Sequence, residues 1–281
     1  MENCRITEET LAAFAGTLRR EEKGQGTIEK YLRDARAFST WLAGAPVTKR
    51  LAAAWKAALL AEDLAPATVN AKLAAVNRLF ACMGCPECRV KPLRIQRRLF
   101  RDESREPTKA EYERLVSAAE SLGRERLALL LEAICATGIR VSEVRYLTVE
   151  AAGRGIAEIR LKGKIRTILL PGRLCRKLLK YARKQKTASG EIFVTGSGRG
   201  ISRKQIWAEM KALCARAGVE ASKVFPHNLR HLFARTFYRA CRDVAKLADV
   251  LGHSSIETTR IYLISTGAEH ARTLARLGLV S

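Results

Sequence analysis

Residues 224–263 read VFPHNLRHLFARTFYRACRDVAKLADVLGHSSIETTRIYL and begin with the pattern of an amphipathic helix. Pro226 suits the first helical position, because its fixed φ angle and its missing N–H are harmless there. Leu229, Phe233 and Phe237 then recur at helical spacing. We expect these apolar residues to form the face of the helix that packs on a hydrophobic core.

Ionisable side chains occupy another face of the same helix. His227, Arg230 and His231 are spaced so that an imidazole and a guanidinium lie one turn apart, and we expect this face to point outward. A second helix over about 242–251 is expected to end at a glycine, a residue suited to a left-handed cap. His253 follows directly, in a loop.

A third helix is predicted after this loop. Ser254 and Glu257 have the spacing of a capping box, which marks a helix start. The helix is expected to carry Tyr262, nine residues past His253. His227, Arg230, His253 and Tyr262 are thereby gathered at turns and exposed faces.

A family resemblance rests on motifs spread along the chain. H-x-x-R-H at 227–231, L-G-H at 251–253 and the tyrosine of TTRIYL resemble the C-terminal signature of the tyrosine recombinases, which include phage integrases and Xer-type enzymes. ATGIRVSEV at 136–144 resembles the first arginine box of that family, with Arg140 at the matching position. TIEKYLRDARAF and APATVNAKLAAVNRLF resemble its helical, SAM-like core-binding domain. The resemblance covers nearly the whole chain and favours a simple Xer-like arrangement.

The resemblance implies an enzyme: a site-specific DNA recombinase or integrase, which either integrates a mobile element or resolves replicons. Such an enzyme cleaves and rejoins double-stranded DNA through a 3′-phosphotyrosine intermediate and a Holliday junction. No ATP, metal or other cofactor is implied, because cationic side chains neutralise the phosphate and the ester conserves the bond energy. The nucleophile is Tyr262, and the other implied catalytic residues are Arg140, Lys162, His227, Arg230 and His253.

Each residue type fits a step of this chemistry. The two arginines can hold the non-bridging phosphate oxygens by bidentate, permanently charged contacts. A tyrosine hydroxyl has a pKa near ~10, so it needs cations or a base to become a nucleophile. His227 is expected to take the tyrosine proton, Lys162 to protonate the leaving 5′ oxygen, and His253 to bond the phosphate. His231 is expected to support its neighbours, and Glu143 to orient Arg140.

The catalytic lysine has two candidates. Residues 156–161 and 165–170 alternate and are rich in β-branched side chains, which predicts a hairpin with Lys162, Gly163 and Lys164 in its turn. The family's lysine precedes the glycine, which matches Lys162. Because this turn is one residue shorter than the common form, Lys164 stays a competitor.

Charge supports a polyanionic partner. The formal net charge is +23 and the pI is about 10.2. Residues 96–281 carry 36 Lys and Arg against 18 Asp and Glu, net +18, whereas residues 1–95 carry 15 against 10, net +5. Further DNA contacts are predicted at polar and basic positions of the helical bundle, the linker, the hairpin and a later helix: Lys72, Asn77, Arg78, Arg97, Arg98, Lys164, Arg203 and Lys204.

The expected fold is mainly α with a small β-sheet. A helical core-binding domain over 1–88 is joined by a basic linker, 89–107, to an α+β catalytic domain over 108–281. A strand is also predicted in EIFVT, residues 191–195. A short amphipathic tail helix over about 265–281 cannot bury itself well, and the resemblance implies that it docks on a neighbouring protomer of a homo-tetramer that binds two DNA sites. The alternative is that this helix packs on its own protomer.

No secretion signal or membrane span is apparent, since the start is polar and no apolar run approaches ~20 residues. A cytoplasmic, reducing location is expected, with all eight cysteines as free thiols. Cys82, Cys85 and Cys88 form a C-x-x-C-x-x-C run, but a tetrahedral metal site needs four ligands and no fourth follows nearby.

Two other functions compete with recombination. A type IB topoisomerase shares the tyrosine chemistry, but the histidine of H-x-x-R and the tail past Tyr262 argue against it. A non-catalytic DNA-binding protein is disfavoured by the intact set of catalytic residues.

Overall fold

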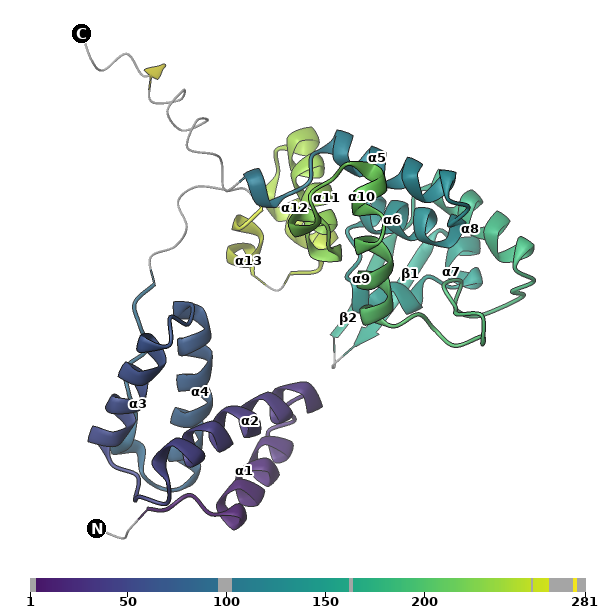
Figure 1. Ribbon diagram of the computed structural model, residues 1–281. Coiled ribbons are helices and arrows are strands. Elements are labelled where there is room, and N and C mark those ends of the chain that lie inside the picture. The colour runs from purple at the N-terminus through teal and green to yellow at the C-terminus, as the bar shows by residue number, and fades with distance from the viewer. Residues whose placement is uncertain (1–3, 96–102, 162–163, 254, 263–274, 277–281) are drawn as a thin grey trace. The chain divides into compact units, whose positions relative to one another are not determined.

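The computed structural model describes residues 4–95, 103–161, 164–253, 255–262 and 275–276, and the chain divides into two compact units, Met1–Arg97 and Arg98–Ser281 (Figure 1). The described residues are mostly helical with one two-stranded sheet, which confirms the predicted fold class. No helix in these described ranges is both long and apolar enough to cross a membrane.

The first unit is a bundle of four helices, as the apolar periodicity predicted. Its helices are α1 (Glu8–Arg20), α2 (Gln25–Leu42), α3 (Lys49–Ala61) and α4 (Pro66–Cys82), followed by the 3₁₀ turn η1 (Pro86–Cys88). α4 packs against the other three helices. The ring of Phe38 lies 4.9 Å from Trp55 and 5.6 Å from Phe80 at the centre of one core cluster. Leu79, on the other side of α4, packs into a second cluster with Phe14.

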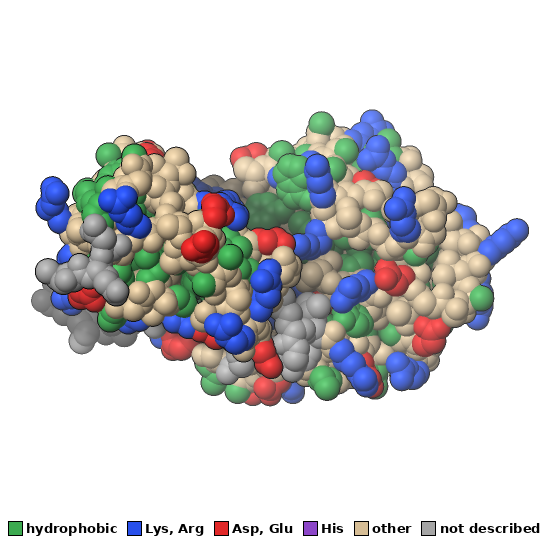
Figure 2. Space-filling view, turned by 90° about the horizontal axis from the view of Figure 1, so that it is seen from below, with side chains coloured by type: hydrophobic (Ala, Val, Ile, Leu, Met, Phe, Trp, Pro, Cys, Tyr) green, Lys and Arg blue, Asp and Glu red, His purple; other side chains and the backbone are tan. Residues whose placement is uncertain are grey.

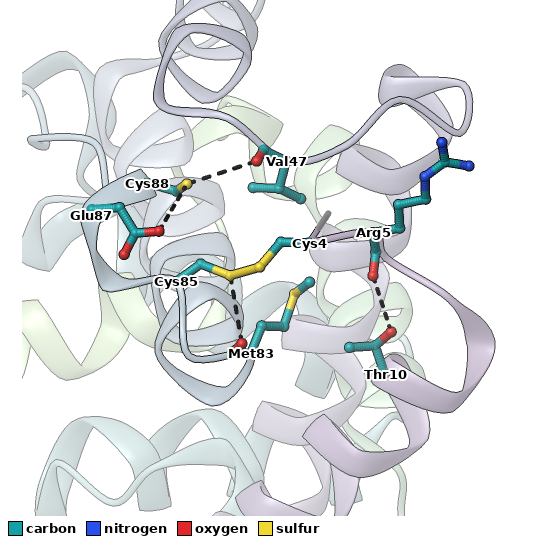
Figure 3. Close-up of a disulfide and its surroundings, with 8 residues drawn as sticks. All are labelled: Cys4, Arg5, Thr10, Val47, Met83, Cys85, Glu87 and Cys88. Atoms are coloured by element: carbon teal, nitrogen blue, oxygen red, sulfur yellow. Dashed lines mark hydrogen bonds between the residues drawn. A yellow bond between two sulfur atoms is a disulfide. The ribbon is translucent and has the colours of Figure 1, made fainter. Parts of the chain in front are cut away.

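A disulfide joins Cys4 to Cys85 in this unit (Figure 3). The expectation that all eight cysteines are free is therefore wrong for these two, which stand 81 residues apart in sequence. The bond pins the segment before α1 to the turn after α4, where the Val47 N–H also donates to the Cys4 carbonyl at 2.6 Å. Cys82 and Cys88 are free thiols, and the described residues contain no group of three or more potential metal ligands.

The chain that leaves the bundle is held on α4 by two asparagines. The Asn77 side chain donates to the Val90 carbonyl at 2.8 Å and accepts from the Val90 N–H at 2.9 Å. Asn70 makes the same pair with Leu93, at 2.9 and 2.7 Å. Lys56 on α3 adds a bond to the Lys91 carbonyl. The first part of the predicted linker is thus fixed to the bundle, because each amide replaces the partners of an extended backbone.

The second unit contains the remaining elements: η2 (Glu103–Arg105), α5 (Lys109–Ser121), α6 (Glu125–Thr137), η3 (Val141–Tyr146), α7 (Val149–Arg154), β1 (Ile156–Leu161), β2 (Lys164–Leu169), α8 (Gly172–Lys184), α9 (Arg203–Lys211), α10 (Cys214–Ala217), η4 (Ala221–Lys223), α11 (Pro226–Cys241), α12 (Val244–Leu251) and α13 (Ile256–Arg260). α6 lies at the centre of its core, because Leu127, Leu130, Leu131 and Ile134 are fully buried. α5, α8, α9 and α11 all pack on α6. The segment that carries Arg140 follows α6 directly, so it lies near α11, which carries Arg230, although the two are far apart in sequence.

The predicted hairpin is present as the antiparallel pair β1 and β2, with Ile159 opposite Arg166. The predicted strand over 191–195 is wrong. Only isolated bridges occur there, Thr148 with Glu191 and Val194 with Gly200. A β-branched run forms a strand only where a partner supplies a ladder, and here the chain turns through Gly196 and Gly198 instead.

Candidate active site

The first arginine motif begins where α6 ends. Gly138 takes the left-handed conformation, φ +62°, that terminates the helix. A Cβ at this position would clash with the ring of Phe233, so glycine also lets α11 approach closely. Ile139 is fully buried and anchors the turn. Arg140 therefore leaves the core at a fixed point, at the start of η3.

A buried carboxylate holds Arg140 in place, as the sequence predicted. Glu143 is only 3% exposed. Its Oε1 accepts from the Arg140 side chain at 3.0 Å and its Oε2 from the Arg140 backbone N–H at 2.9 Å. The same Oε2 accepts from Arg166 on β2 at 2.7 Å. One carboxylate thus organises two cations, with Arg140 still partly exposed.

Arg166 is a residue that sequence reasoning missed. It donates to the Leu251 carbonyl and lies against Gly252, so it ties β2 to the L-G-H motif. Burial lowers the pKa of Arg166 to about 10, against the opposing charge of Glu143. The signal was available: Arg166 shares the inward register of β2 with buried Ile168, and a charge among core residues needs a buried partner.

Arg230 is buried, so the expectation that it points outward is wrong. α11 packs against α6 on one side and α12 on another, which leaves Arg230 only 2% exposed. Its guanidinium donates to the Gly138 carbonyl and, at 2.8 Å, to the Leu251 carbonyl. It therefore links the ends of α6 and α12. Burial lowers the pKa of Arg230, while a hydrogen bond with the Tyr262 side chain raises it.

His253 is oriented from both sides. Its Nε2 lies 3.1 Å from Nη2 of Arg230, and its Nδ1 lies 2.9 Å from Oγ1 of Thr259. Because a guanidinium can only donate, Nε2 accepts and Nδ1 carries the proton. Burial, followed by the charge of Arg230, lowers the pKa of His253 to about 4, so the ring is neutral at pH 7.

Tyr262 lies inside this cluster and not at the surface. It is 5% exposed and packs with Leu247 and Leu251 of α12. Its ring stacks on His253 at a centroid distance of 5.7 Å and meets the edge of His231 at 4.6 Å. The phenol, the buried guanidinium and two imidazoles thus come together within one chain.

The helix before Tyr262 differs from the expectation. Ser255, and not Ser254, is the N-cap of α13, and it accepts from the Glu257 N–H at 3.2 Å. Ser254 lies outside the described residues. α13 ends at Arg260, so Tyr262 sits in the following turn, where its N–H donates to the Thr259 carbonyl. Thr259 is fully buried and contacts both His253 and Tyr262, a link the sequence did not reveal.

His227 and His231 form a connected pair on the first two turns of α11. Their Nε2 atoms are 3.0 Å apart. Nδ1 of His231 lies 2.9 Å from Oε1 of Glu106, a partner that sequence reasoning missed. His227 is the more exposed of the two rings. Burial lowers its pKa, and the charges of Arg230 and Arg140 act in the same direction, which places His227 in the same electrostatic field as the rest of the cluster.

The remaining predicted site residues, Lys162 and the DNA contacts, do not join this cluster among the described residues. Lys162, Arg97 and Arg98 lie outside the described residues, and of Lys164 only the backbone is described, at the start of β2. The Asn77 amide is engaged with Val90, and Arg78 forms an ion pair with Glu21. Lys72 is half-buried on α4, while Arg203 and Lys204 are exposed at the start of α9. On the face seen in Figure 2, Lys and Arg side chains are spread over both units among fewer Asp and Glu.

The sequence of this chain is similar to those of known proteins over nearly its whole length. Residues 107–269 match the phage integrase family, and residues 6–83 match the phage integrase N-terminal SAM-like domain. Tyrosine recombinase XerA of Pyrococcus furiosus is 30% identical over 98% of this chain and 96% of its own length. Tyrosine recombinase XerC of Erythrobacter litoralis is 30% identical over 95% of this chain and 89% of its own.

Solved structures show the same fold at lower identity. The Tn1549 transposon integrase in complex with transposon right end DNA is 15% identical, with a TM-score of 0.73 over 97% of this chain and 99% of that one. A lambda integrase dimer bound to a core site is 18% identical, with a TM-score of 0.73 over 91% and 94%. XerH recombinase bound to its difH substrate is 20% identical, with a TM-score of 0.67 over 95% and 84%.

Proposed function

Because the chain belongs to the phage integrase family of tyrosine recombinases, enzymes of site-specific DNA recombination, we propose that Tyr262 is its nucleophile and that Arg140, Arg230, His227 and His253 complete the described part of the site. The observation that carries this proposal is the burial of the Tyr262 phenol beside Arg230 and between two imidazoles. A tyrosine that served only for packing would not need a buried guanidinium as its neighbour.

Phosphate binding falls to the two arginines. Arg230 is immobilised by two backbone carbonyls and also bonds to His253 and Tyr262, which leaves one N–H of its five-donor fork for a phosphoryl oxygen. Arg140 is fixed by Glu143 yet remains partly exposed. Donors held in advance need no reorganisation when charge develops on the phosphorus, which is the main source of rate in such sites.

Cleavage then requires two proton transfers. The Tyr262 hydroxyl attacks phosphorus, its proton passes to His227, a Tyr–O–P bond forms, and the bond to the 5′ oxygen breaks. Lys162 protonates that oxygen, with Lys164 as the alternative. Phosphate charge beside His253 favours its protonated form, in which Nε2 gives up the hydrogen bond from Arg230 and donates to the phosphate instead. A 5′ hydroxyl of a second strand reverses the step, so the ester supplies the energy for rejoining.

The assembly and the other DNA contacts extend the proposal. We assign DNA binding to the helical bundle, residues 1–88, to the basic linker, 89–107, and to the catalytic domain, 108–281, with Lys72, Arg203 and Lys204 as phosphate contacts. The enzyme acts in the cytoplasm as a homo-tetramer on two DNA sites and exchanges strands through a Holliday junction. Residues 265–281 dock between protomers; apart from 275–276, they lie outside the described residues.

The test is covalent trapping. A bound duplex is first selected from a random pool, and a nick is then placed beside the cleavage point so that the short product diffuses away. The wild-type protein is expected to form a denaturant-resistant adduct with DNA, whereas Tyr262→Phe binds the duplex and forms none. A plasmid with two sites separates recombination, which exchanges segments, from relaxation alone. Equal adduct from wild type and Tyr262→Phe would refute the assignment.

A further inference from the structure

The segment that enters the catalytic unit is fixed to the helix that carries the histidines. The Asn228 side chain donates to the Arg105 carbonyl at 2.7 Å, and Arg235 donates to the Pro107 carbonyl at 3.2 Å. Between them, Glu106 bonds to His231 and forms an ion pair with Arg235. Asn228, His231 and Arg235 lie three and four residues apart, so one face of α11 receives residues 105–107.

This contact determines where protons lie on the two histidines. A carboxylate can only accept, so Nδ1 of His231 carries a proton and donates to Oε1 of Glu106. Burial, followed by the charge of Arg230, lowers the pKa of His231 to about 4, so the ring has no second proton at pH 7. Its Nε2 therefore accepts, and the proton between the rings belongs to Nε2 of His227. Nδ1 of His227 is left with the lone pair.

We propose that Glu106, at the end of the interdomain segment, is a positioning residue that sets the tautomer of His227 through His231 and stabilises the charge that His227 acquires on taking a proton. The proposal rests on the proposed role of His227 as proton acceptor. It makes the catalytic base dependent on the segment that connects the two units. The three groups have the logic of a nucleophile's base with its orienting carboxylate, extended by one imidazole.

The alternative is that Glu106 only anchors the segment through its ion pair with Arg235. The two roles differ in their effect on the acidity of the histidine pair. The charged and titratable groups around that pair are Glu106 of the entering segment, Arg230 and Arg235 of α11, Arg140 of η3, His253 after α12, and Tyr262. Of these described groups, Glu106 alone is anionic at neutral pH, so removing its charge lowers the stability of a protonated histidine in the pair.

The kinetic test follows the rate of adduct formation on the nicked duplex against pH. Without the carboxylate, protonated His227 is less stable, so Glu106→Gln is expected to move the acid limb of the profile to lower pH by about half a unit or more. Arg235→Gln leaves the Glu106 charge uncompensated and is expected to move the limb to higher pH. Glu106→Ala is expected to lower the plateau rate about 10- to 100-fold with unchanged DNA affinity. Glu113→Ala, at an exposed acid of α5, is the matched control.

A second measurement does not depend on catalysis. The chain has four histidines, so ring ¹⁵N resonances can be assigned by single substitutions. His231 is expected to be the Nδ1–H tautomer in the wild type and to lose that preference in Glu106→Ala. Equal loss of rate at every pH in Glu106→Gln and Arg235→Gln, or an unchanged His231 tautomer in Glu106→Ala, would overturn the proposal. Absence of adduct with the wild-type protein would instead refute the proposed function, since the tautomer shift would still be observable.

Discussion

Replacing Glu143 with alanine is expected to destabilise the catalytic unit far more than loss of an ordinary ion pair would. Glu143 is 3% exposed and accepts three hydrogen bonds, two from Arg140 and one from Arg166. Arg140 reaches solvent and can be hydrated after the substitution. The Arg166 side chain is only 13% exposed, so its charge would be left buried with no carboxylate.

The magnitude follows from that burial. Removing one partner of a buried pair costs about 3–5 kcal/mol, because the other charge stays desolvated. The pair of Arg126 with Glu209 is a matched control, since its N···O distance is also 2.7 Å but its side chains are 24% and 23% exposed. Glu209→Ala is expected to cost about 1 kcal/mol or less, because water screens a pair of that exposure.

The assay is native-state hydrogen exchange of the α6 amides, which lie in the core of the catalytic unit and are therefore expected to exchange only when that unit unfolds. Adding Arg166→Met to Glu143→Ala should recover part of the loss, because the orphaned charge is then absent. Equal losses in Glu143→Ala and Glu209→Ala, or no recovery in the double variant, would show that burial of Arg166 does not control the effect.

Three further outcomes are expected. Cys4→Ser should destabilise the helical bundle by up to about 4 kcal/mol, because the disulfide closes a loop of 81 residues. The control Cys175→Ser, at a free thiol, should have little effect. Non-reducing peptide mapping that finds no Cys4–Cys85 peptide would contradict the bond. Gly138→Ala should lower the unfolding free energy by more than the ~1–2 kcal/mol of a left-handed alanine, because its Cβ also meets Phe233. In the control Gly123→Ala, the Cβ faces open space at a similar φ. Equal losses of stability in thermal melts would refute the steric contribution of Phe233. The pKa of His253 in the fold, about 4, lies below its unfolded value of about 6.5, so the unfolded chain binds the proton first as the pH falls. Stability should therefore be highest above pH 6.5 and fall towards pH 4, by at most ~1.4 kcal/mol per pH unit from this group. Urea unfolding of His253→Gln should show a flatter decline with falling pH, and curves identical to the wild type would exclude the effect.

Sequence was sufficient where a local pattern carries the information. The four-helix bundle and the hairpin follow from periodicity, and the locations of Arg140 after α6 and of His253 after α12 follow from motifs. It failed where the outcome depends on packing between distant segments. Arg230 has the spacing of a surface residue on α11, yet α6 and α12 cover it. A helical pattern shows which residues share a face but not how many neighbours the helix has.

Long-range polar contacts were also beyond the sequence. Glu106 meets His231 across 125 positions and Arg166 meets Leu251 across 85, so no window of the chain contains both partners. The cap at Ser255 was missed by one residue because two adjacent serines offer the same hydroxyl. Cys4 and Cys85 are 81 residues apart, so no local pattern shows that they pair.

The hydrogen bonds of Asn70 and Asn77 on α4 shorten the connection between the two units of the enzyme. Among the described residues, the Asn70 amide holds Leu93 on α4 and the Asn228 amide holds Arg105 on α11, so the connection between these two points spans twelve peptide steps. Even fully extended, it reaches about 40 Å. Once either half is seated on a duplex, the other is confined nearby at an effective concentration in the millimolar range. An insertion of a few residues in this connection would therefore lower the affinity for DNA without changing any residue that contacts DNA.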